Sequence, residues 1–233
     1  MVKFIVAIET VKIKEFLFST NKLRVIRGAS YLLDYLNQVE VPKILEEAGI
    51  EEKDIIYIGA GNAKFFTDTK EKADEIINKV KKTYENEASG VKIAAVYREK
   101  TSSEKVWDSL EELSKLTAIE KSKGFSTLNT DLPYVEKCEL SGNEVAEIDY
   151  NNLKEDLIKL DYKLEGSKIL LSDYNKSKDD KIDKVEIETL KDHIKKLAKT
   201  TGRISEGTLK KIIASDLLKK SNRNIYKNKK IGF

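Results

Sequence analysis

The amino-acid sequence predicts an α+β fold, in which an antiparallel sheet of β-α-β-β-α-β order is followed by a mostly helical extension. Three observations carry this prediction. β-branched runs of strand length alternate with long segments of helical periodicity over the first 100 residues. A glycine-rich turn of hairpin length separates two of those runs. Beyond residue 100 the runs give way to charged and apolar residues in helical spacing.

The first strand and the first helix follow from the spacing of apolar residues. The stretch VKFIVAIE, residues 2 to 9, is apolar and β-branched, as a buried strand requires. Residues 29 to 48 carry apolar side chains at helical spacing, and Gly49 is a natural C-terminal stop. Pro42 lies inside this helix, where its missing amide donor predicts a kink or a break.

Two strands and a tight turn come next. Residues 54 to 58 and 63 to 67 are predicted strands. Residues 59 to 62 are the hairpin turn between them, because glycine adopts positive φ at no steric cost. The core or a face of the sheet is the expected place of the aromatic residues in these strands, Tyr57, Phe65 and Phe66.

A capped helix and a fourth strand complete the predicted sheet. Asp68 or Thr69 supplies the N-cap of a helix that runs to about Asn86. Residues 91 to 97, VKIAAVY, form the fourth strand. This order of elements is the ferredoxin-like arrangement, in which two helices cover one face of an antiparallel sheet.

The rest of the chain is predicted to be mostly helical. Residues 103 to 117 form a helix whose Trp107 is expected to pack against the sheet, and residues 121 to 150 are irregular. The turn SDYNKSKDDK lacks the ligand spacing and central glycine of an EF-hand, which predicts a solvated connection at its polar residues, Asp173, Asn175, Lys178 and Asp180. Three domains are therefore expected: the sheet over residues 1 to 100, a linking helix with an irregular segment over 101 to 150, and a helical region with a basic tail over 151 to 233.

Composition limits the class of protein. The charges nearly cancel, with 43 basic and 40 acidic residues, so nucleic-acid binding requires a local basic stripe, and one occurs near each end. The chain has no apolar run of about 18 residues and no signal peptide, which predicts a cytoplasmic protein without a membrane partner. Cys138 and His193 are each the only residue of their type. An intrachain disulfide is excluded, and a histidine-based triad or multi-histidine metal site is disfavoured.

The segment IKEFLFSTNKLRVIRGAS, residues 13 to 30, combines an apolar patch with basic residues and a small-residue corner. Free backbone amides at Gly28, Ala29 and Ser30, at the start of a helix, would suit an anion such as a phosphate. Arg24 and Arg27 would add charge-assisted hydrogen bonds. The alternative interpretation is a helix-turn-helix packing unit with solvated arginines.

The pattern IETVKIKEFLFSTNKLRVIRGASYLL, followed by IYIGAGN, resembles the large, polymerase-like subunit of type III CRISPR effector complexes. The similarity is dense over residues 5 to 66 and extends to about residue 97. It implies a palm domain related to GGDEF cyclases and a role in antiviral defence. It also implies partners: other effector subunits or a second palm, and crRNA or target RNA through the complex.

The resemblance also implies what the hairpin does. Active palms of the family convert ATP to cyclic oligoadenylates with two metal ions, which the acids of a GGDD-type hairpin hold. Here Gly59 keeps the first glycine, Ala60 replaces the second, and Gly61 and Asn62 replace both aspartates. Glu9 matches the acid of the first strand, or is simply a solvated or capped acid at a strand end. One carboxylate cannot assemble a two-metal site, so the resemblance implies a catalytically silent palm.

The silent palm is expected to bind nucleotide, ATP with Mg²⁺ being the candidate, or a partner. Because the first and third strands are neighbours in this fold, the end of the first strand is expected beside the hairpin. The segment leaving that strand is expected to bring its basic corner to the same surface. The candidate binding residues are Glu9, Arg24, Arg27, Gly28, Ser30, Gly59, Gly61 and Asn62.

A zinc knuckle often follows the palm in this family, and the region around Cys138 resembles a remnant of one. Ser141 stands in place of the second cysteine, and no second pair follows. The chain is therefore expected to fold without zinc, which needs four ligands in a structural site. Two other functions stay open: half of a nucleotidyl cyclase or polymerase site that a partner palm completes, and a plain ferredoxin-like interaction module.

Overall fold

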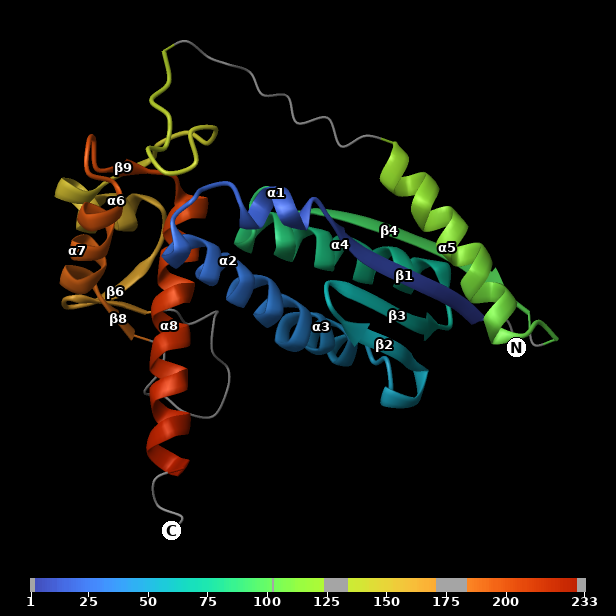
Figure 1. Cartoon of the computed structure of the whole chain (residues 1–233). Helices are drawn as coiled ribbons and strands as arrows, with labels where there is room; N and C mark the ends of the chain where they lie inside the picture. The colour runs from blue at the N-terminus through green and yellow to red at the C-terminus, as the bar shows by residue number, and fades with distance from the viewer. Residues whose placement is uncertain (1–2, 102, 124–133, 171–183, 230–233) are drawn as a thin grey trace. The chain divides into compact units, whose positions relative to one another are not determined.

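The computed structural model describes residues 3–101, 103–123, 134–170 and 184–229. The chain forms two compact units (Figure 1). Unit 1 comprises residues 1–16 and 32–128, and unit 2 comprises residues 17–31 and 129–233. The turn SDYNKSKDDK, with its four polar residues, lies outside the described residues.

Unit 1 contains a four-stranded antiparallel sheet in the order β2-β3-β1-β4. Its strands are β1 (Lys3–Val11), β2 (Ile55–Gly59), β3 (Asn62–Thr67) and β4 (Lys92–Lys100). The sequence placed each strand to within a few residues. A mixed α/β structure with an antiparallel sheet is therefore confirmed for this part of the chain.

Helices cover both faces of the sheet. On one face, α4 (Lys70–Glu87) contacts β1, β3 and β4, and α3 (Val41–Glu47) contacts α4. On the other face, α5 (Val106–Ser122) crosses β1 and β4 (Figure 1). The helices between the strands thus cover one face, and the predicted helix after residue 100 covers the other. Because both faces are covered, Ile5 to Ile8 are all buried.

The packing of α5 also corrects the prediction for Trp107. Leu113 packs on Ile5 and Ala7, with Leu110 at the edge of this cluster. Trp107 is six residues before Leu113, which places it about 120° around the helix. Its side chain is 76% exposed. Leucines, and not the tryptophan, therefore attach α5 to the sheet.

The helical segment between the first two strands starts earlier than predicted. It consists of α1 (Ile13–Leu17), α2 (Leu23–Tyr35), a π-helical turn (Leu36–Glu40) and α3. Pro42 lies in the first turn of α3, directly after the π-helical turn. The widened turn accommodates the proline ring, which would otherwise meet the carbonyl four residues earlier. At the next helix, Thr69 is the N-cap, accepting a hydrogen bond from the Lys72 amide at 3.2 Å.

Unit 2 is less helical than predicted. Besides the first part of α2, its helices are α6 (Leu153–Lys159), α7 (Ile187–Leu197) and α8 (Glu206–Lys229). Two small antiparallel sheets accompany them, composed of β5 (Ile148–Asp149) and β9 (Arg203–Ile204), and of β6 (Lys163–Glu165), β7 (Lys168–Leu170) and β8 (Lys184–Glu186). Strands this short leave no periodic signal in a sequence.

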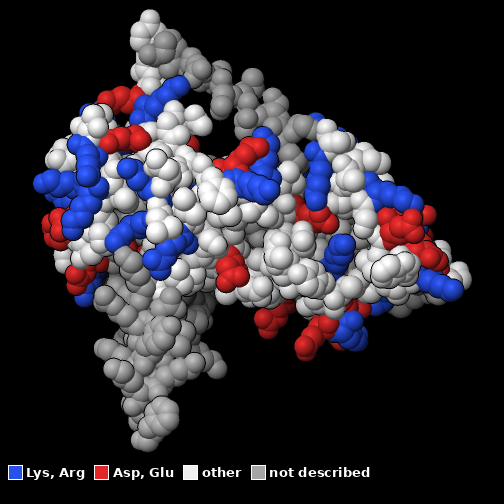
Figure 2. Space-filling view, viewed as in Figure 1, with Lys and Arg blue, Asp and Glu red and all other residues white. Residues whose placement is uncertain are grey.

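Charged side chains of both signs are mixed over the surface shown in Figure 2. Across the described ranges, no helix has the length and apolar character needed to cross a membrane.

Candidate functional site

The tip of the β2–β3 hairpin closes on the end of β1. Ala60 and Gly61 both have positive φ, 50° and 78°, as in a two-residue type I′ turn. The carbonyl of Gly61 accepts hydrogen bonds from the Thr10 amide at 2.8 Å and from the Thr10 hydroxyl at 3.0 Å. The turn is therefore held against β1 as well as within the hairpin.

The contact with Thr10 leaves no room for a side chain at position 61. A Cβ atom there would lie 2.2 Å from Thr10 Oγ1 and 3.3 Å from Ile13 Cδ1. Real Cβ atoms do not approach other atoms so closely, so an aspartate at this position would displace the backbone or the threonine. The hairpin thus lacks the acid that the family pattern has here, and its geometry disfavours one.

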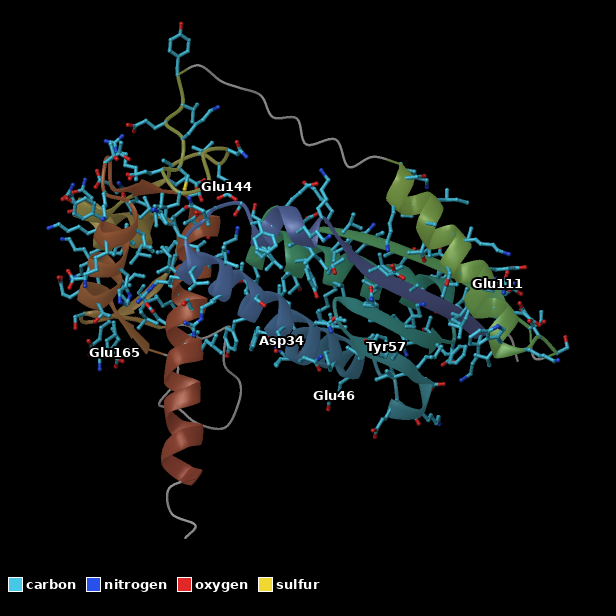
Figure 3. All side chains as sticks on the ribbon, in the orientation of Figure 1. Asp34, Glu46, Tyr57, Glu111, Glu144 and Glu165 are labelled. Carbon is cyan, nitrogen blue, oxygen red and sulfur yellow. The ribbon has the colours of Figure 1, made fainter. Side chains whose placement is uncertain are left out.

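Gly59 supports an exposed aromatic ring. A Cβ atom at position 59 would lie 2.7 Å from the Tyr57 hydroxyl and 3.0 Å from Tyr57 Cζ, so the ring lies across the glycine. Tyr57 is on the edge strand β2 and is 48% exposed (Figure 3). The absence of a side chain at 59 therefore creates a flat aromatic surface at the edge of the sheet.

Glu9 lies beside the hairpin, as the sequence predicted, directly opposite Asn62 in the β1–β3 register. Its carboxylate forms an ion pair with the ammonium group of Lys121, near the end of α5. The carboxylate is mostly buried, with the Glu9 side chain 17% exposed. It is therefore neither a solvated strand-end acid nor an unpaired metal ligand.

These residues share one face of the sheet. Tyr57 is opposite Lys64 and Glu9 is opposite Asn62. Alternate residues of a strand point to the same side, so all four belong to the face that α5 covers over β1 and β4. Over β2 and β3 this face offers an exposed ring, an amide and the Lys64 ammonium group, which has no ion-pair partner among the described residues. Such groups suit stacking and anion contacts.

The basic corner predicted between residues 24 and 30 belongs to unit 2 and is built differently. α2 begins at Leu23, so the amides of residues 28 to 30 are inside the helix and are not free for an anion. Arg24 is ion-paired with Asp216 at 2.7 Å, and Asp216 also contacts His193 Nδ1 at 2.8 Å. Arg27 and Ser30 are exposed.

Gly28 is a packing residue. A Cβ atom there would lie 1.6 Å from the carbonyl oxygen of Lys211 in α8. α2 and α8 therefore meet backbone to backbone at this point. Of the predicted site residues, the structure brings together Glu9, Gly59, Gly61 and Asn62 in unit 1 and places Arg24, Arg27, Gly28 and Ser30 in unit 2.

A polar network occupies the region that resembles a zinc knuckle. Cys138 is buried, with its sulfur 3.4 Å from Thr208 Oγ1. Burial raises the pKa of the Cys138 thiol, but hydrogen bonds with Ser141 and Thr208 outweigh burial and lower it. The Ser205 hydroxyl donates to the carboxylate of Glu144. No cluster of three or more residues suited to a metal occurs among the described residues. Folding without zinc stays a prediction.

Two polar residues of unit 2 were missed by the sequence reasoning. Lys211 is 1% exposed and donates to Ser19 Oγ at 3.0 Å, and burial lowers the pKa of its ammonium group. Glu139 accepts hydrogen bonds from the amides of Thr200, Thr201 and Gly202 at 2.7 to 3.0 Å. Partial burial would raise the pKa of Glu139, but these bonds lower it to about 2. Neither role has a local signal, because every partner is distant in the sequence.

The described hairpin residues offer little to a metal pair. Glu9 is opposite Asn62 in the register, and Asn62 is a neutral, weak ligand for a hard cation. The described hairpin residues therefore do not reproduce the pair of hairpin acids that the resemblance implies for active palms.

A family model described as Csm1 subunit domain B matches residues 4–137. A Csm1-Csm4 cassette in complex with cA4 is 14% identical, with a TM-score of 0.44 over 52% of this chain and 19% of that chain. The Csm1-Csm4 subcomplex of the type III-A CRISPR-Csm interference complex is 15% identical, with a TM-score of 0.44 over 53% and 19%. Csm1 in T. onnurineus is 15% identical, with a TM-score of 0.43 over 55% and 20%. This chain thus spans about a fifth of each. No curated protein matches.

Proposed function

Because the chain belongs to the Csm1 subunit domain B family, we propose that unit 1 is a catalytically silent palm of a type III CRISPR complex. It acts by binding a nucleotide or partner subunits. The sheet order β2-β3-β1-β4 supports the assignment to a ferredoxin-like palm. Other effector subunits, such as the Csm4 of the structures named above, are part of this proposal.

The observation that carries the proposal is the closed hairpin tip. The contact between Gly61 and Thr10 disfavours the acid that a two-metal site needs at this position. The ion pair with Lys121 compensates the charge of Glu9, the other family acid. Both features of the described hairpin support a palm without the metal pair that cyclic oligoadenylate synthesis requires. The proposed role of this part of the sheet is therefore binding.

The open surface over β2 and β3 supports a nucleotide as the ligand. A base stacks on an aromatic ring with about 1–3 kcal/mol, and Tyr57 is the exposed ring of this surface. Lys64 lies opposite Tyr57 in the register and supplies a positive charge for a phosphate. A second palm that presents an acidic hairpin would meet the same ammonium group.

A binding titration with ATP and Mg²⁺, followed by calorimetry, tests the proposal. Tyr57→Ala is expected to weaken ATP binding by about 1–3 kcal/mol if it removes a stacked base. Tyr134→Ala is the matched control, because Tyr134 is a 97% exposed tyrosine of unit 2. The purified chain should form no cyclic oligoadenylate. ATP affinity that does not change when Tyr57 or Lys64 is substituted would contradict the proposal. So would cyclic oligoadenylate that the wild type forms and the Glu9→Ala variant does not.

A further inference from the structure

The two edge strands of the sheet in unit 1 differ in how well they are protected against pairing. β2 has five residues, and its pairing with β3 shifts register between Ile55 and Tyr57. β4 has nine residues, and its pairing with β1 is regular from Lys92 to Lys100. Among the described strands, β4 pairs with β1 alone, which leaves its outer backbone edge open. Short strands and bulges blunt an edge, whereas a long regular edge is a template for another strand.

The middle of the β4 edge carries no charge. Residues 93 to 96 have the sequence IAAV, and the charged residues of the strand lie at its ends, at Lys92 and at residues 98 to 100. Edge strands that avoid pairing usually carry a charge or a proline along their length. The centre of β4 therefore has none of the side chains that oppose the addition of a strand.

One side of α5 overhangs this edge, and two ion pairs identify it. Glu112 contacts Arg98 of β4 at 3.1 Å. Lys121 is nine residues later, on the opposite side of the helix, and it pairs with Glu9 of β1. The Glu112 side of α5 therefore faces away from β1, over the outer edge of β4 (Figure 1).

This overhanging side of α5 is apolar at its centre. Leu116 and Ile119 are four and seven residues after Glu112, so they share its side of the helix. Their exposed fractions are 39% and 57%. Leu116 is about 6 Å beyond Glu112 along the helix. Val96 is about 6.6 Å from Arg98 along the strand in the same direction. The exposed leucine is therefore level with the uncharged middle of the edge.

We propose that two copies of this chain associate through their β4 edges, so that two four-stranded sheets join into one antiparallel sheet. The two-fold axis passes beside Val96 and brings Leu116 and Ile119 of both copies together. Because α5 lies over β1 and β4, the two α5 axes are two strand spacings apart, roughly 10 Å. Helices pack at about 8–10 Å. Strand pairing and helix packing are thus satisfied by one arrangement.

The charges beside the apolar pair agree with this symmetry. Glu112 precedes Leu116 and Ile119, and Lys123 follows them on the same side of α5. A two-fold axis makes the two helices antiparallel, so Glu112 of each copy lies near Lys123 of the other. Both residues are exposed, so the pairs favour the antiparallel orientation more than they add affinity.

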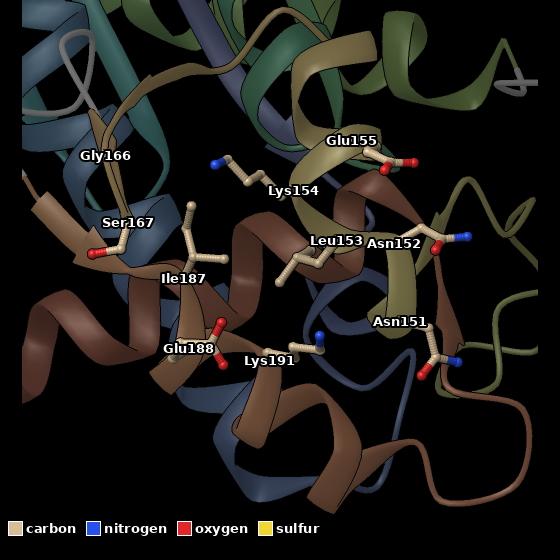
Figure 4. Close-up of a pocket in the computed structure, with 10 residues that line it drawn as sticks. All are labelled: Asn151, Asn152, Leu153, Lys154, Glu155, Gly166, Ser167, Ile187, Glu188 and Lys191. Atoms are coloured by element: carbon tan, nitrogen blue, oxygen red, sulfur yellow. The ribbon is translucent and has the colours of Figure 1, made fainter.

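The proposed interface is separate from the other candidate surfaces. Tyr57 is on β2, at the opposite edge of the sheet, so the dimer leaves the proposed nucleotide surface open in both copies. Unit 2 contains a hollow of about 230 Å³ beside α6 and α7 (Figure 4). Its apolar lining residues, Leu153 and Ile187, are buried and offer no apolar surface to a partner.

Sedimentation equilibrium of the full chain over a range of concentrations tests the proposal. The wild type should form a dimer, and Leu116→Glu/Ile119→Glu should weaken it at least about a hundredfold, because the change places charges in the centre of the interface. Trp107→Glu is the matched control, since Trp107 is 76% exposed on the opposite side of the same helix. It should leave the dimer unchanged. A chain that stays monomeric up to about 100 μM, or a dimer that the double variant leaves intact, overturns the proposal.

Cross-linking gives a second arm that does not depend on the folding of the double variant. Leu116→Cys should form a disulfide-linked dimer on mild oxidation, because the two side chains meet at the axis. Trp107→Cys should cross-link at least about tenfold more slowly. Wild type is the blank, since its single cysteine, Cys138, is buried. Equal rates for the two variants would refute the assignment of the interface to the β4 edge.

Discussion

Two glycines in the segments that resemble the CRISPR subunit, Gly28 in unit 2 and Gly61 in unit 1, are both required by close contacts. At Gly28 two helix backbones meet, whereas at Gly61 a hairpin tip closes on the side chain of Thr10. The first glycine holds unit 2 together, and the second determines what the hairpin of unit 1 can present. A glycine in such a segment can therefore be required by packing, as Gly28 is, or can shape a candidate binding surface, as Gly61 does.

The largest effect is expected at Gly28. Gly28→Ala should lower the free energy of unfolding by about 3 kcal/mol, because the new methyl group meets a backbone carbonyl that cannot move aside. Thermal or urea unfolding measures this loss. Gly207→Ala is the matched control, since the nearest atom to a Cβ there is 3.4 Å away. It should change stability by less than about 0.5 kcal/mol. Equal effects of the two changes would show that the α2–α8 contact is loose.

The contacts of these two glycines were not predictable from the sequence, whereas the strands of unit 1 were. The reason is how far apart the contacting residues lie along the chain. The strands, the hairpin and the Thr69 cap were predictable, because their signals lie within a few neighbouring residues. Arg24 was not, because its partner Asp216 is 192 positions away. The anion site predicted at residues 28 to 30 was wrong because helix α2 begins at Leu23 and holds these amides inside it. The contact of Gly28 with α8 is long-range and has no local signal. In the candidate site, Glu9 beside Asn62 was predictable from the topology, but the Lys121 pair was not.

A second test addresses the hairpin. Gly61→Asp should cost about 2 kcal/mol of unfolding free energy, from the positive φ and the contact with Thr10. Asn62→Asp should cost much less, because Asn62 is a partly exposed strand residue. Thr10→Ala should recover part of the loss in Gly61→Asp. Full stability of Gly61→Asp would mean that the hairpin opens readily, and the structural argument for silence would fail.

The Glu139 contacts predict how unit 2 responds to acid. The pKa of Glu139 is lowered from 4.5 to about 2 in the folded chain, so its carboxylate stabilises the fold above pH 4.5. This contribution is lost as the pH falls from about 4.5 to about 2. Because the group is partly exposed, we expect Glu139→Gln to cost only about 1 kcal/mol at pH 7.

Unfolding of the wild type and Glu139→Gln across this pH range checks the sign. The difference between the two proteins should shrink as the pH falls towards 2. Glu165→Gln is a control, since Glu165 is an exposed acid of the same unit. A difference that does not change with pH would show that Glu139 acts through packing and not through its charge.

The smallest stability effect is expected at the Glu9–Lys121 pair of unit 1. Lys121 is 39% exposed, so the pair lies near the surface and Lys121→Met should cost about 0.5 kcal/mol. The loss should diminish with added salt, because salt screens exposed charges. Lys115→Met is a control at an exposed pair of the same helix. The change frees the Glu9 carboxylate, yet one acid cannot hold two metal ions, so the variant should still form no cyclic oligoadenylate from ATP and Mg²⁺. Product from Lys121→Met that is absent from Lys121→Met/Glu9→Gln would show that the ion pair, and not the closed hairpin, keeps this palm silent.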